Sequence, residues 1–294
     1  MQIFTYFTLT ITAFFWGGTF IAGRILAESM APASSSFLRF AIASISLIIV
    51  LLLTEKKFPV PRIKQFLTLI FLGFTGVFCY NIFFFTGLKY ITAGRASLII
   101  AFTPLTITIL ATLFTSERLN AKQLGGILIS LAGALLVVSN GRPQLLLQGS
   151  FGPGEKALLG CVLSWSLYSI AGRSVLNTLS PLVAVCYSSI IGTMLLAVPA
   201  FKENLSGSLF TISSVEWLSL GYLGVFGTAI GFSLYYKGIN KIGTTRAGIF
   251  INMVPVFALL LSWLLLHETV QPMVLVGGLF ILTGVTATNI ARRS

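Results

Sequence analysis

The chain has 294 residues, of which 56% are hydrophobic and only 9% are charged. Soluble domains carry about 25% charged residues, so a soluble fold of this length is excluded, and disorder is excluded by the same composition. The net charge of +12 does not indicate nucleic-acid binding, because the basic residues are scattered between apolar stretches and form no stripe or reader motif. We therefore expect an integral membrane protein surrounded by a lipid bilayer, with no nucleic-acid partner.

A helix needs about 20 mostly apolar residues to cross the hydrocarbon core. The sequence offers ten such windows, at residues 4–26, 34–53, 66–88, 93–115, 121–139, 156–176, 182–201, 215–238, 245–266 and 272–290. Their apolar residues are continuous and do not alternate, which disfavours the strands of a membrane barrel. The predicted fold class is an all-α integral membrane protein of ten transmembrane helices.

The first and eighth windows carry further sequence signals. The apolar stretch from Ile3 to Ala22 has no preceding Lys or Arg and is too long for the apolar h-region of a signal peptide, so we expect it to be a retained first span. Ser213 and Glu216 have the spacing of a capping box at the start of the eighth window.

The distribution of Lys and Arg predicts the orientation, because cytoplasmic ends of membrane helices are enriched in basic residues. If both termini are cytoplasmic, the inner ends collect the larger basic set: Lys56, Lys57, Arg62, Lys64, Arg118, Lys122, Arg173, Lys237, Lys241, Arg246, Arg292 and Arg293. The outer ends then collect the smaller set: Arg24, Arg39, Lys89, Arg95, Arg142, Lys156 and Lys202. Short loops between the spans suit a bacterial inner (plasma) membrane.

The two halves of the chain repeat each other. Trp16 and the segment Ile21-Ala-Gly-Arg24 recur 149 residues later as Trp165 and Ile170-Ala-Gly-Arg173. Further along, the offset becomes 151, and it relates Gly87, Arg95, Ala96, Pro104, Glu117, Gly126 and Gly133 to Gly238, Arg246, Ala247, Pro255, Glu268, Gly277 and Gly284. We predict a first five-helix repeat at residues 1–140, a linker at 141–155 and a second five-helix repeat at 156–294.

Five spans in each half have a direct topological consequence. Because five is odd, the second copy must enter the membrane from the opposite side, so the repeats are inverted and related by a pseudo-two-fold axis in the membrane plane. Inverted repeats are characteristic of transporters, in which the two copies exchange tilts around a central site.

These motifs resemble the drug/metabolite transporter superfamily, in particular its EamA-type members, over the whole chain. The most similar parts are Phe15-Trp-Gly-Gly-Thr-Phe20, Phe37-Leu-Arg-Phe40, Ser116-Glu-Arg-Leu119 and His267-Glu-Thr269. The resemblance implies a ten-helix, two-repeat carrier for amino acids or other small metabolites. It also implies that spans one, three, four, six, eight and nine surround a central cavity.

Two repeat-matched prolines indicate breaks in spans four and nine. Pro104 and Pro255 fall about 18 Å into their windows, near mid-membrane, and each leaves the carbonyl four residues earlier without its helical donor. They are candidate hinges, with passive packing kinks as the alternative. Asn252 lies close to Pro255 and favours function in span nine, because an amide in lipid needs a partner.

Aromatic and amide residues fall inside the spans that the resemblance places around the cavity. The candidates for substrate binding are Trp16, Tyr80, Asn81, Phe85, Trp165, Tyr168, Tyr235, Tyr236 and Asn252. Aromatic walls with a few hydrogen-bonding groups are the usual form of a small-molecule pocket. Helix packing and interfacial anchoring is the alternative interpretation.

Charged residues at the helix ends are candidate gates. Arg24, Arg95 and Glu268 fall on the predicted outside, and their repeat mates Arg173, Arg246 and Glu117 fall on the predicted inside. We expect each set to form a network that closes as the other opens, with simple anchoring at the interface as the alternative.

The sequence predicts a carrier and not an enzyme. It contains one histidine, no Asp, no nucleophile–base constellation and no metal-ligand spacing among its three cysteines, so no cofactor and no metal are expected. No carboxylate lies at the centre of a span, which disfavours a cationic-drug pump and favours a neutral or zwitterionic solute. The resemblance implies that this solute is an amino acid or a similar metabolite and that the expected direction is export. The alternatives are a drug or organic-solute efflux carrier of the same fold, or a non-transport membrane protein such as a scaffold. A homodimer is compatible with the sequence.

Overall fold

The computed structural model describes residues 2–55, 59–114, 121–142, 144, 152–176, 178–242 and 244–291. Within those ranges the protein is helical and contains no strand, which confirms the predicted all-α class. The helices are α1 (Gln2–Ser29), α2 (Pro32–Glu55), α3 (Ile63–Leu72), η1 (Gly73–Cys79), α4 (Tyr80–Tyr90), α5 (Ala93–Ile100), α6 (Thr103–Phe114), α7 (Ala121–Val138), α9 (Pro153–Leu176), α10 (Pro181–Lys202), α11 (Leu205–Ser208), η2 (Leu209–Thr211), α12 (Ser214–Gly221), η3 (Tyr222–Ile230), α13 (Gly231–Ile242), α14 (Thr244–Ile251), α15 (Val254–Leu266) and α16 (Pro272–Ala291).

The helices coincide with the predicted windows, and four windows are composite. The third is α3–η1–α4, the fourth α5–α6, the eighth α12–η3–α13 and the ninth α14–α15. By length and composition, eight helical stretches are able to cross a membrane, and Val254–Leu266 and Pro272–Thr288 are shorter apolar helices. The predicted capping box at the start of α12 is present, with Ser213 and Glu216 each accepting from the other's backbone N–H.

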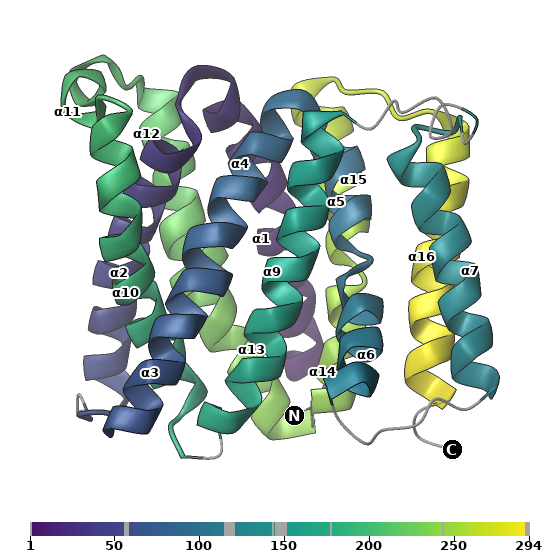
Figure 1. Cartoon of the computed structure of the whole chain (residues 1–294), viewed down its shortest axis with the longest axis horizontal. Coiled ribbons are helices and arrows are strands. Elements are labelled where there is room, and N and C mark those ends of the chain that lie inside the picture. The colour runs from purple at the N-terminus through teal and green to yellow at the C-terminus, as the bar shows by residue number, and fades with distance from the viewer. Residues whose placement is uncertain are drawn as a thin grey trace.

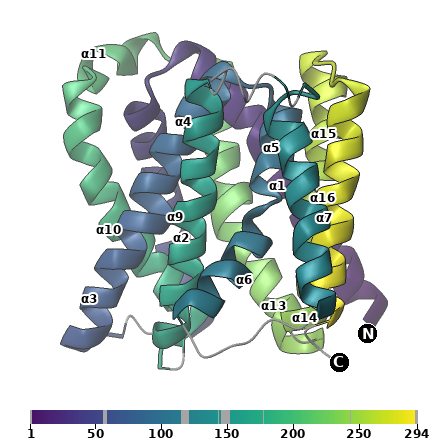
Figure 2. The same ribbon diagram turned by 45° about the vertical axis from the view of Figure 1, so that its right-hand side comes forward.

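The helices run between two faces of the molecule (Figures 1 and 2). The start of α1 and the end of α16 lie at one face, called here the terminal face. The turns that follow α1, α4 and α15 lie at the opposite face, called here the far face. In chain order the predicted spans alternate in direction between these faces, and α9 starts at the far face, where Gly154 approaches Tyr90 and Ile91.

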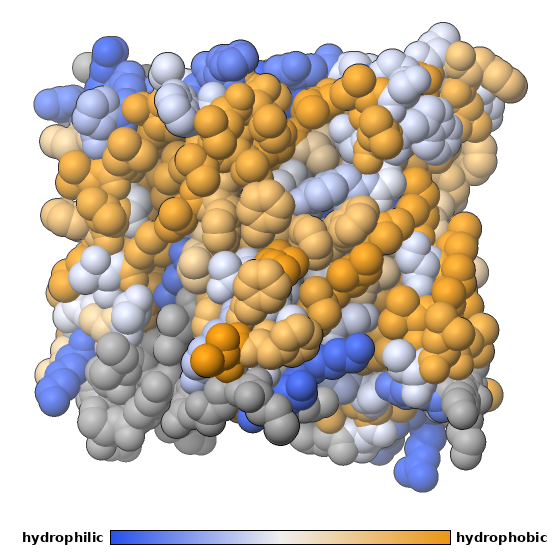
Figure 3. Space-filling model, turned by 180° about the vertical axis from the view of Figure 1, so that it is seen from behind, coloured by the Kyte–Doolittle hydropathy of each residue, from blue (hydrophilic) through white to orange (hydrophobic). Residues whose placement is uncertain are grey.

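The surface between the two faces is apolar. Figure 3 shows hydrophobic residues across the middle of one side of the molecule, with hydrophilic residues gathered toward its upper and lower edges. Many large apolar side chains are exposed, more than a soluble protein leaves in contact with water. They include Leu53 (75%), Leu265 (62%) and Trp263 (60%). Such a band matches the hydrocarbon layer of a bilayer.

Helices α2 and α10 form an antiparallel pair at one end of the long axis (Figure 1). At its middle, the hydroxyls of Ser44 and Thr193 lie 3.2 Å apart, and these residues are repeat mates at the 149-residue offset. At the far face the carboxylate of Glu203 accepts from the backbone N–H groups of Ala33 (3.2 Å) and Ser34 (2.8 Å), which start α2. Such a carboxylate satisfies free N–H groups at a helix start and complements the helix dipole.

Helices α7 and α16 form a second antiparallel pair at the other end of the long axis (Figure 1). A Cβ added to Gly133 would lie 2.5 Å from the carbonyl oxygen of Gly277, and one added to Gly284 would lie 2.5 Å from that of Gly126. Between these contacts, Ser130 Oγ donates to the carbonyl of Ile281 at 3.4 Å. Small residues let the two backbones approach this closely.

Irregular turns occur at matching positions in the two halves. The π-helical segments η1 and η3 overlap when the chain is shifted by 151 residues. The same shift carries the break between α5 and α6, at Ala101 and Phe102, onto the break between α14 and α15, at Asn252 and Met253. Both breaks come just before the two prolines that were expected to cause them.

Candidate functional site

Aromatic rings from four helices form one connected group between the halves of the chain. Trp16 of α1 contacts Phe232 and Tyr235 of α13, with ring centroids 5.6 and 5.2 Å apart. Trp165 of α9 contacts Tyr80 of α4 at 5.3 Å. We call this group the aromatic cluster; its members are Trp16, Tyr80, Phe84, Trp165, Tyr168, Phe232, Tyr235 and Tyr236.

The two repeats contribute to this cluster in a related way. Because α1 matches α9 and α4 matches α13, the contact of Trp16 with α13 is the repeat counterpart of the contact of Trp165 with α4. Trp165 also lies 6.4 Å from Phe232, which joins the two sides. The cluster therefore lies where the halves meet, as expected of a site shared by two repeats.

Tight backbone approach fixes Trp16 within the cluster. Its indole Nε1 donates to the carbonyl of Gly227 at 3.0 Å, and a Cβ on Gly231 would lie 2.7 Å from the same nitrogen. The hollow beside Trp16 and Tyr235 has essentially no room for even a water molecule. Ligand pockets usually measure about 300–1,000 Å³, so in this conformation the rings leave less room than a metabolite site requires.

At the helix break in the first half, a side chain supplies the hydrogen bond that the backbone lacks. Pro104 cannot donate to the carbonyl of Ile100, and Thr103 Oγ1 donates to that carbonyl instead, at 2.6 Å. In the second half Asn252 lies within the break, and its Nδ2 donates to Thr286 Oγ1 of α16 at 3.4 Å. The amide that was expected in the substrate site thus points toward α16.

Arg39 is the functional candidate that the sequence did not reveal. It was counted among residues at the outer ends, where arginine side chains reach water. In the structure its residue is only 8% exposed, and Nη1 donates to Asn81 Oδ1 of α4 at 2.8 Å. Asn81 is 1% exposed, and its Nδ2 donates to the carbonyl of Val77 at 2.7 Å.

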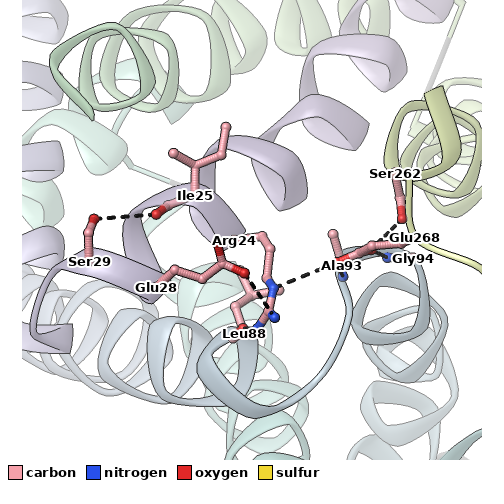
Figure 4. Close-up of polar contacts among 9 residues, drawn as sticks. All are labelled: Arg24, Ile25, Glu28, Ser29, Leu88, Ala93, Gly94, Ser262 and Glu268. Carbon is pink, nitrogen blue, oxygen red and sulfur yellow. Dashed lines mark hydrogen bonds and ion pairs between the residues drawn. The ribbon is translucent and has the colours of Figure 1, made fainter. Parts of the chain in front are cut away.

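Arg24 and Glu268 meet at the far face (Figure 4). Arg24 Nε lies 3.6 Å from Glu268 Oε1, and its Nη1 also donates to the carbonyl of Leu88. The carboxylate of Glu268 accepts from the backbone N–H groups of Ala93 (3.2 Å) and Gly94 (3.5 Å) at the start of α5. One carboxylate thereby joins α1, α5 and the end of α15.

A second ion pair lies at the same face. Arg95 Nη2 lies 2.8 Å from Glu155 Oε1 at the start of α9, and Arg95 Nε donates to the carbonyl of Val137 at 2.9 Å. Both charged side chains are 14% exposed. Glu155 was not among the predicted gate residues; its position at the end of the linker gave no signal in the sequence that it would face the start of span four.

The repeat mates of these gate residues are Glu117, Arg173 and Arg246. Glu117 lies outside the described residues. Arg173 and Arg246 lie on α9 and α14, and their side chains are outside the described part of the structure. The predicted network on the terminal face therefore remains a prediction.

The structure brings six of the nine predicted substrate-binding residues together. Trp16, Tyr80, Trp165, Tyr168, Tyr235 and Tyr236 lie together in the aromatic cluster. Phe85 is joined to the aromatic cluster through Phe84, with ring centroids 5.5 Å apart, but it is 0% exposed and packs in the main hydrophobic core. Phe84 and Phe232 complete the cluster, and Phe232 is the repeat mate of Asn81.

The sequence is similar to known transport proteins along nearly its whole length. The sequence profile of the EamA-like transporter family matches twice, at residues 3–139 and 152–290. The uncharacterized transporter YyaM of Bacillus subtilis (strain 168) is 28% identical over 288 residues, which cover 98% of this chain and 94% of YyaM. A protein of Streptantibioticus cattleyicolor named as a probable terminal-alkyne amino-acid exporter is 26% identical over 283 residues, covering 96% of this chain and 92% of that one.

The fold is also similar to a solved crystal structure. The superposition has a TM-score of 0.63 and covers all of both chains, with 21% sequence identity. This likeness concerns the fold alone. Both relatives are named as transport proteins, and neither is named as an enzyme.

Proposed function

This chain belongs to the EamA-like transporter family, and we propose that it is a secondary carrier that exports a small neutral or zwitterionic metabolite, such as an amino acid, by alternating access. The protein spans the membrane many times, and in the proposal its ten spans form two inverted repeats, at residues 1–140 and 156–294. Both termini are cytoplasmic and the far face is the outside of a bacterial inner membrane.

Reciprocal contacts between repeat mates support the inversion. In a pair of copies related by a two-fold axis, contacts come in reciprocal sets, and a residue near the axis touches its own mate. Ser130 bonds to Ile281, its mate at the 151-residue offset, and on either side Gly126 meets Gly284 while Gly133 meets Gly277. Ser44 and Thr193 give the same relation in the other pair.

The observation that carries the proposal is an ion pair at one face between residues whose repeat mates are expected at the other. Arg24 and Glu268 join at the far face, and the repeat assigns Arg173 and Glu117 to corresponding positions at the terminal face. Exchange of conformations between the repeats would open the first pair and form the second. The aromatic cluster lies between the faces, where the solute would be exposed to each side in turn.

The breaks before Pro104 and Pro255 are the proposed hinges. Each divides its span into two shorter helices, α5 and α6 or α14 and α15, that meet near mid-membrane. Discontinuous helices of this kind line the substrate sites of many carriers. Because α5 carries the far-face contacts of Glu268 and Arg95, bending at its break would couple the site to the gate.

The chemistry of the aromatic cluster favours neutral or zwitterionic solutes. Its members are all aromatic and include no carboxylate that would attract a cationic drug. One relative is named as an amino-acid exporter, which agrees with this class. The alternative is efflux of drugs or other organic solutes through the same fold.

Transport by purified protein in sealed vesicles tests the proposal. We expect saturable uptake of at least one solute from a panel of amino acids, organic acids, sugars and nucleosides, together with counterflow, in which internal unlabelled solute accelerates entry of labelled solute. Flux that neither saturates nor shows counterflow would indicate a channel. A variant with Trp165→Ala should keep its fold and raise the half-saturation concentration, whereas Trp217→Ala on the exposed surface of α12 should not.

A further inference from the structure

Arg39 is a cation held inside the membrane-spanning region without a countercharge. It lies about 10 Å along α2 from the start at Pro32, by the rise of an α-helix. None of the carboxylates in the described part of the chain forms an ion pair with it. An ionisable residue inside a membrane costs several kcal/mol and is retained chiefly where it serves function.

One edge of this guanidinium is free. Nη1 is engaged by Asn81 Oδ1, whereas Nε is buried and has no hydrogen-bond partner among the described residues. A carboxylate binds arginine best through two parallel hydrogen bonds, and Nε with Nη2 forms one of the edges with that geometry. The buried Nε therefore marks an edge suited to an anionic oxygen pair.

Aromatic rings support the position of Arg39. Its guanidinium carbon lies 5.1 Å from the ring centroid of Phe40 and 5.8 Å from that of Phe84. These contacts hold a cation partly desolvated, and the bond to Asn81 fixes its plane. The arrangement is therefore preorganised, which reduces the entropic cost of binding a ligand.

The aromatic cluster connects Arg39 to the proposed solute site. Phe84 stacks on Tyr80 at 5.9 Å, and Tyr80 contacts Trp165 at 5.3 Å. The second repeat has no equivalent charge, because the 149-residue offset matches Arg39 to Ser188 and the 151-residue offset matches Asn81 to Phe232. A single cation at one side of a shared aromatic site gives a ligand a charged end and an apolar end.

From this geometry we infer that Arg39 binds the carboxylate of the transported solute, so the solute class is amphipathic carboxylates: amino acids with apolar side chains or monocarboxylic acids. This inference rests on the proposed carrier function, specifies its substrate and widens the class from neutral or zwitterionic solutes to anionic monocarboxylates. Asn81 is a positioning residue that orients the guanidinium. Arg39 is buried against Phe40 and Phe84 in this conformation, so a solute reaches it only after a ring moves.

Binding of matched acids and amides to the purified protein tests the inference. The probes are L-phenylalanine, L-leucine, 3-phenylpropionate and propionate, each with its carboxamide, measured by the rise in melting temperature with concentration. We expect at least one acid to bind at least tenfold more tightly than its amide. In Arg39→Gln that preference should disappear, and in Arg39→Lys it should weaken.

A second variant separates binding from a merely structural role. Asn81→Asp has nearly the same shape and gives Arg39 an internal carboxylate, so the fold should be kept or stabilised while the acid preference is lost. Arg62→Gln, on the exposed terminal face, is the matched control and should behave as the unmodified protein. Equal binding of acids and amides, or an acid preference that survives both Arg39→Gln and Asn81→Asp, would overturn the inference.

Vesicle transport with the same probes keeps the two proposals distinguishable. Saturable flux of solutes with no preference for acids would leave the carrier function intact and eliminate the role of Arg39. Binding of acids that depends on Arg39, with no flux of any probe, would establish the anion site and contradict the carrier function for that class.

Discussion

The hydroxyls of Ser44 and Thr193 lie 3.2 Å apart, and each residue is the repeat mate of the other. This relationship has a mechanical meaning. If the two repeats exchange conformations, a contact between mates becomes the same contact again, whereas a contact between unrelated residues is replaced by its repeat counterpart. The α2–α10 pair should therefore stay together through the transport cycle, and the contacts at the far face should not.

Paired cysteines test this difference. In a background without Cys79, Cys161 and Cys186, the pair Ser44→Cys and Thr193→Cys should form a disulfide on oxidation and retain transport. The pair Gly94→Cys and Ser262→Cys, where a Cβ on Gly94 would lie 3.3 Å from Ser262 Oγ, should form a disulfide that blocks transport until it is reduced. The measurement is vesicle uptake before and after oxidation, and inactivation by the first pair would refute the fixed-pair idea.

The far-face gate predicts the effect of neutralising Glu268. Glu268→Gln removes the charge that pairs with Arg24 and weakens the cap of α5, so the far face should open more often. With Ser97→Cys as the single cysteine, buried in α5, labelling by an impermeant thiol reagent should be several-fold faster and net transport slower. Glu28→Gln is the matched control, since Glu28 also pairs with Arg24 but is 60% exposed, and exposed pairs contribute about 0–1 kcal/mol.

Charge reversal at the same pair gives a graded result. Arg24→Glu and Glu268→Arg should each reduce transport by an order of magnitude or more, and the double variant should recover only part of it. The ion pair is restored, but E268R cannot accept from the N–H groups of Ala93 and Gly94. Full loss in the double variant, in protein that melts normally, would show that the ion pair does not gate.

The hinge prediction concerns Pro104 and Pro255. Each proline is the second residue of its helix, α6 or α15, where proline costs little; replacing it by Ala supplies the N–H that would let the two half-helices join. We expect an unchanged or higher melting temperature together with a transport rate reduced several-fold. Pro199→Ala is the control, because α10 continues through Pro199 as one helix; an equal loss of rate there would remove the special role of the breaks.

The α7–α16 contact predicts a contrast between neighbouring glycines. Gly133→Ala would push a methyl group to 2.5 Å from a backbone carbonyl, and backbone cannot move aside cheaply, so we expect the melting temperature to fall by several degrees. Gly125→Ala meets nothing within 4 Å and should be neutral or slightly stabilising, since alanine is the better helix former. Equal behaviour of the two variants in a thermal melt would contradict this packing.

The sequence predicted what depends on composition and on strong local rules. Continuous apolar windows located the helices because a bilayer demands them, and Pro104 and Pro255 located the breaks because proline lacks an N–H. The tryptophan mates Trp16 and Trp165 led to the aromatic cluster. In each case one residue type, or the number of apolar residues in a short window, is enough to predict the feature.

The remainder depends on partners that local patterns do not identify. Arg39 was taken for an end residue because its neighbours in sequence do not show that Asn81 and two rings would enclose it. Glu155 faces Arg95 only because α9 begins beside the start of α5. Phe85 shares a helical face with Asn81, but that face turned out to be packed against protein.

The π-helical turns in η1 and η3 carry a consequence for how α4 and α13 can rotate. Each wide turn holds one surplus residue, and when such a turn migrates by one position, the residue it passes changes its direction by about 100°, while the rest of the helix keeps its register. Tyr80 follows η1 directly, and Phe232 comes just after η3. A ring could thus swing out of the solute's path without either end of its helix leaving the membrane surface, and deleting one residue from η1 should remove that freedom and stop flux while helix content is unchanged.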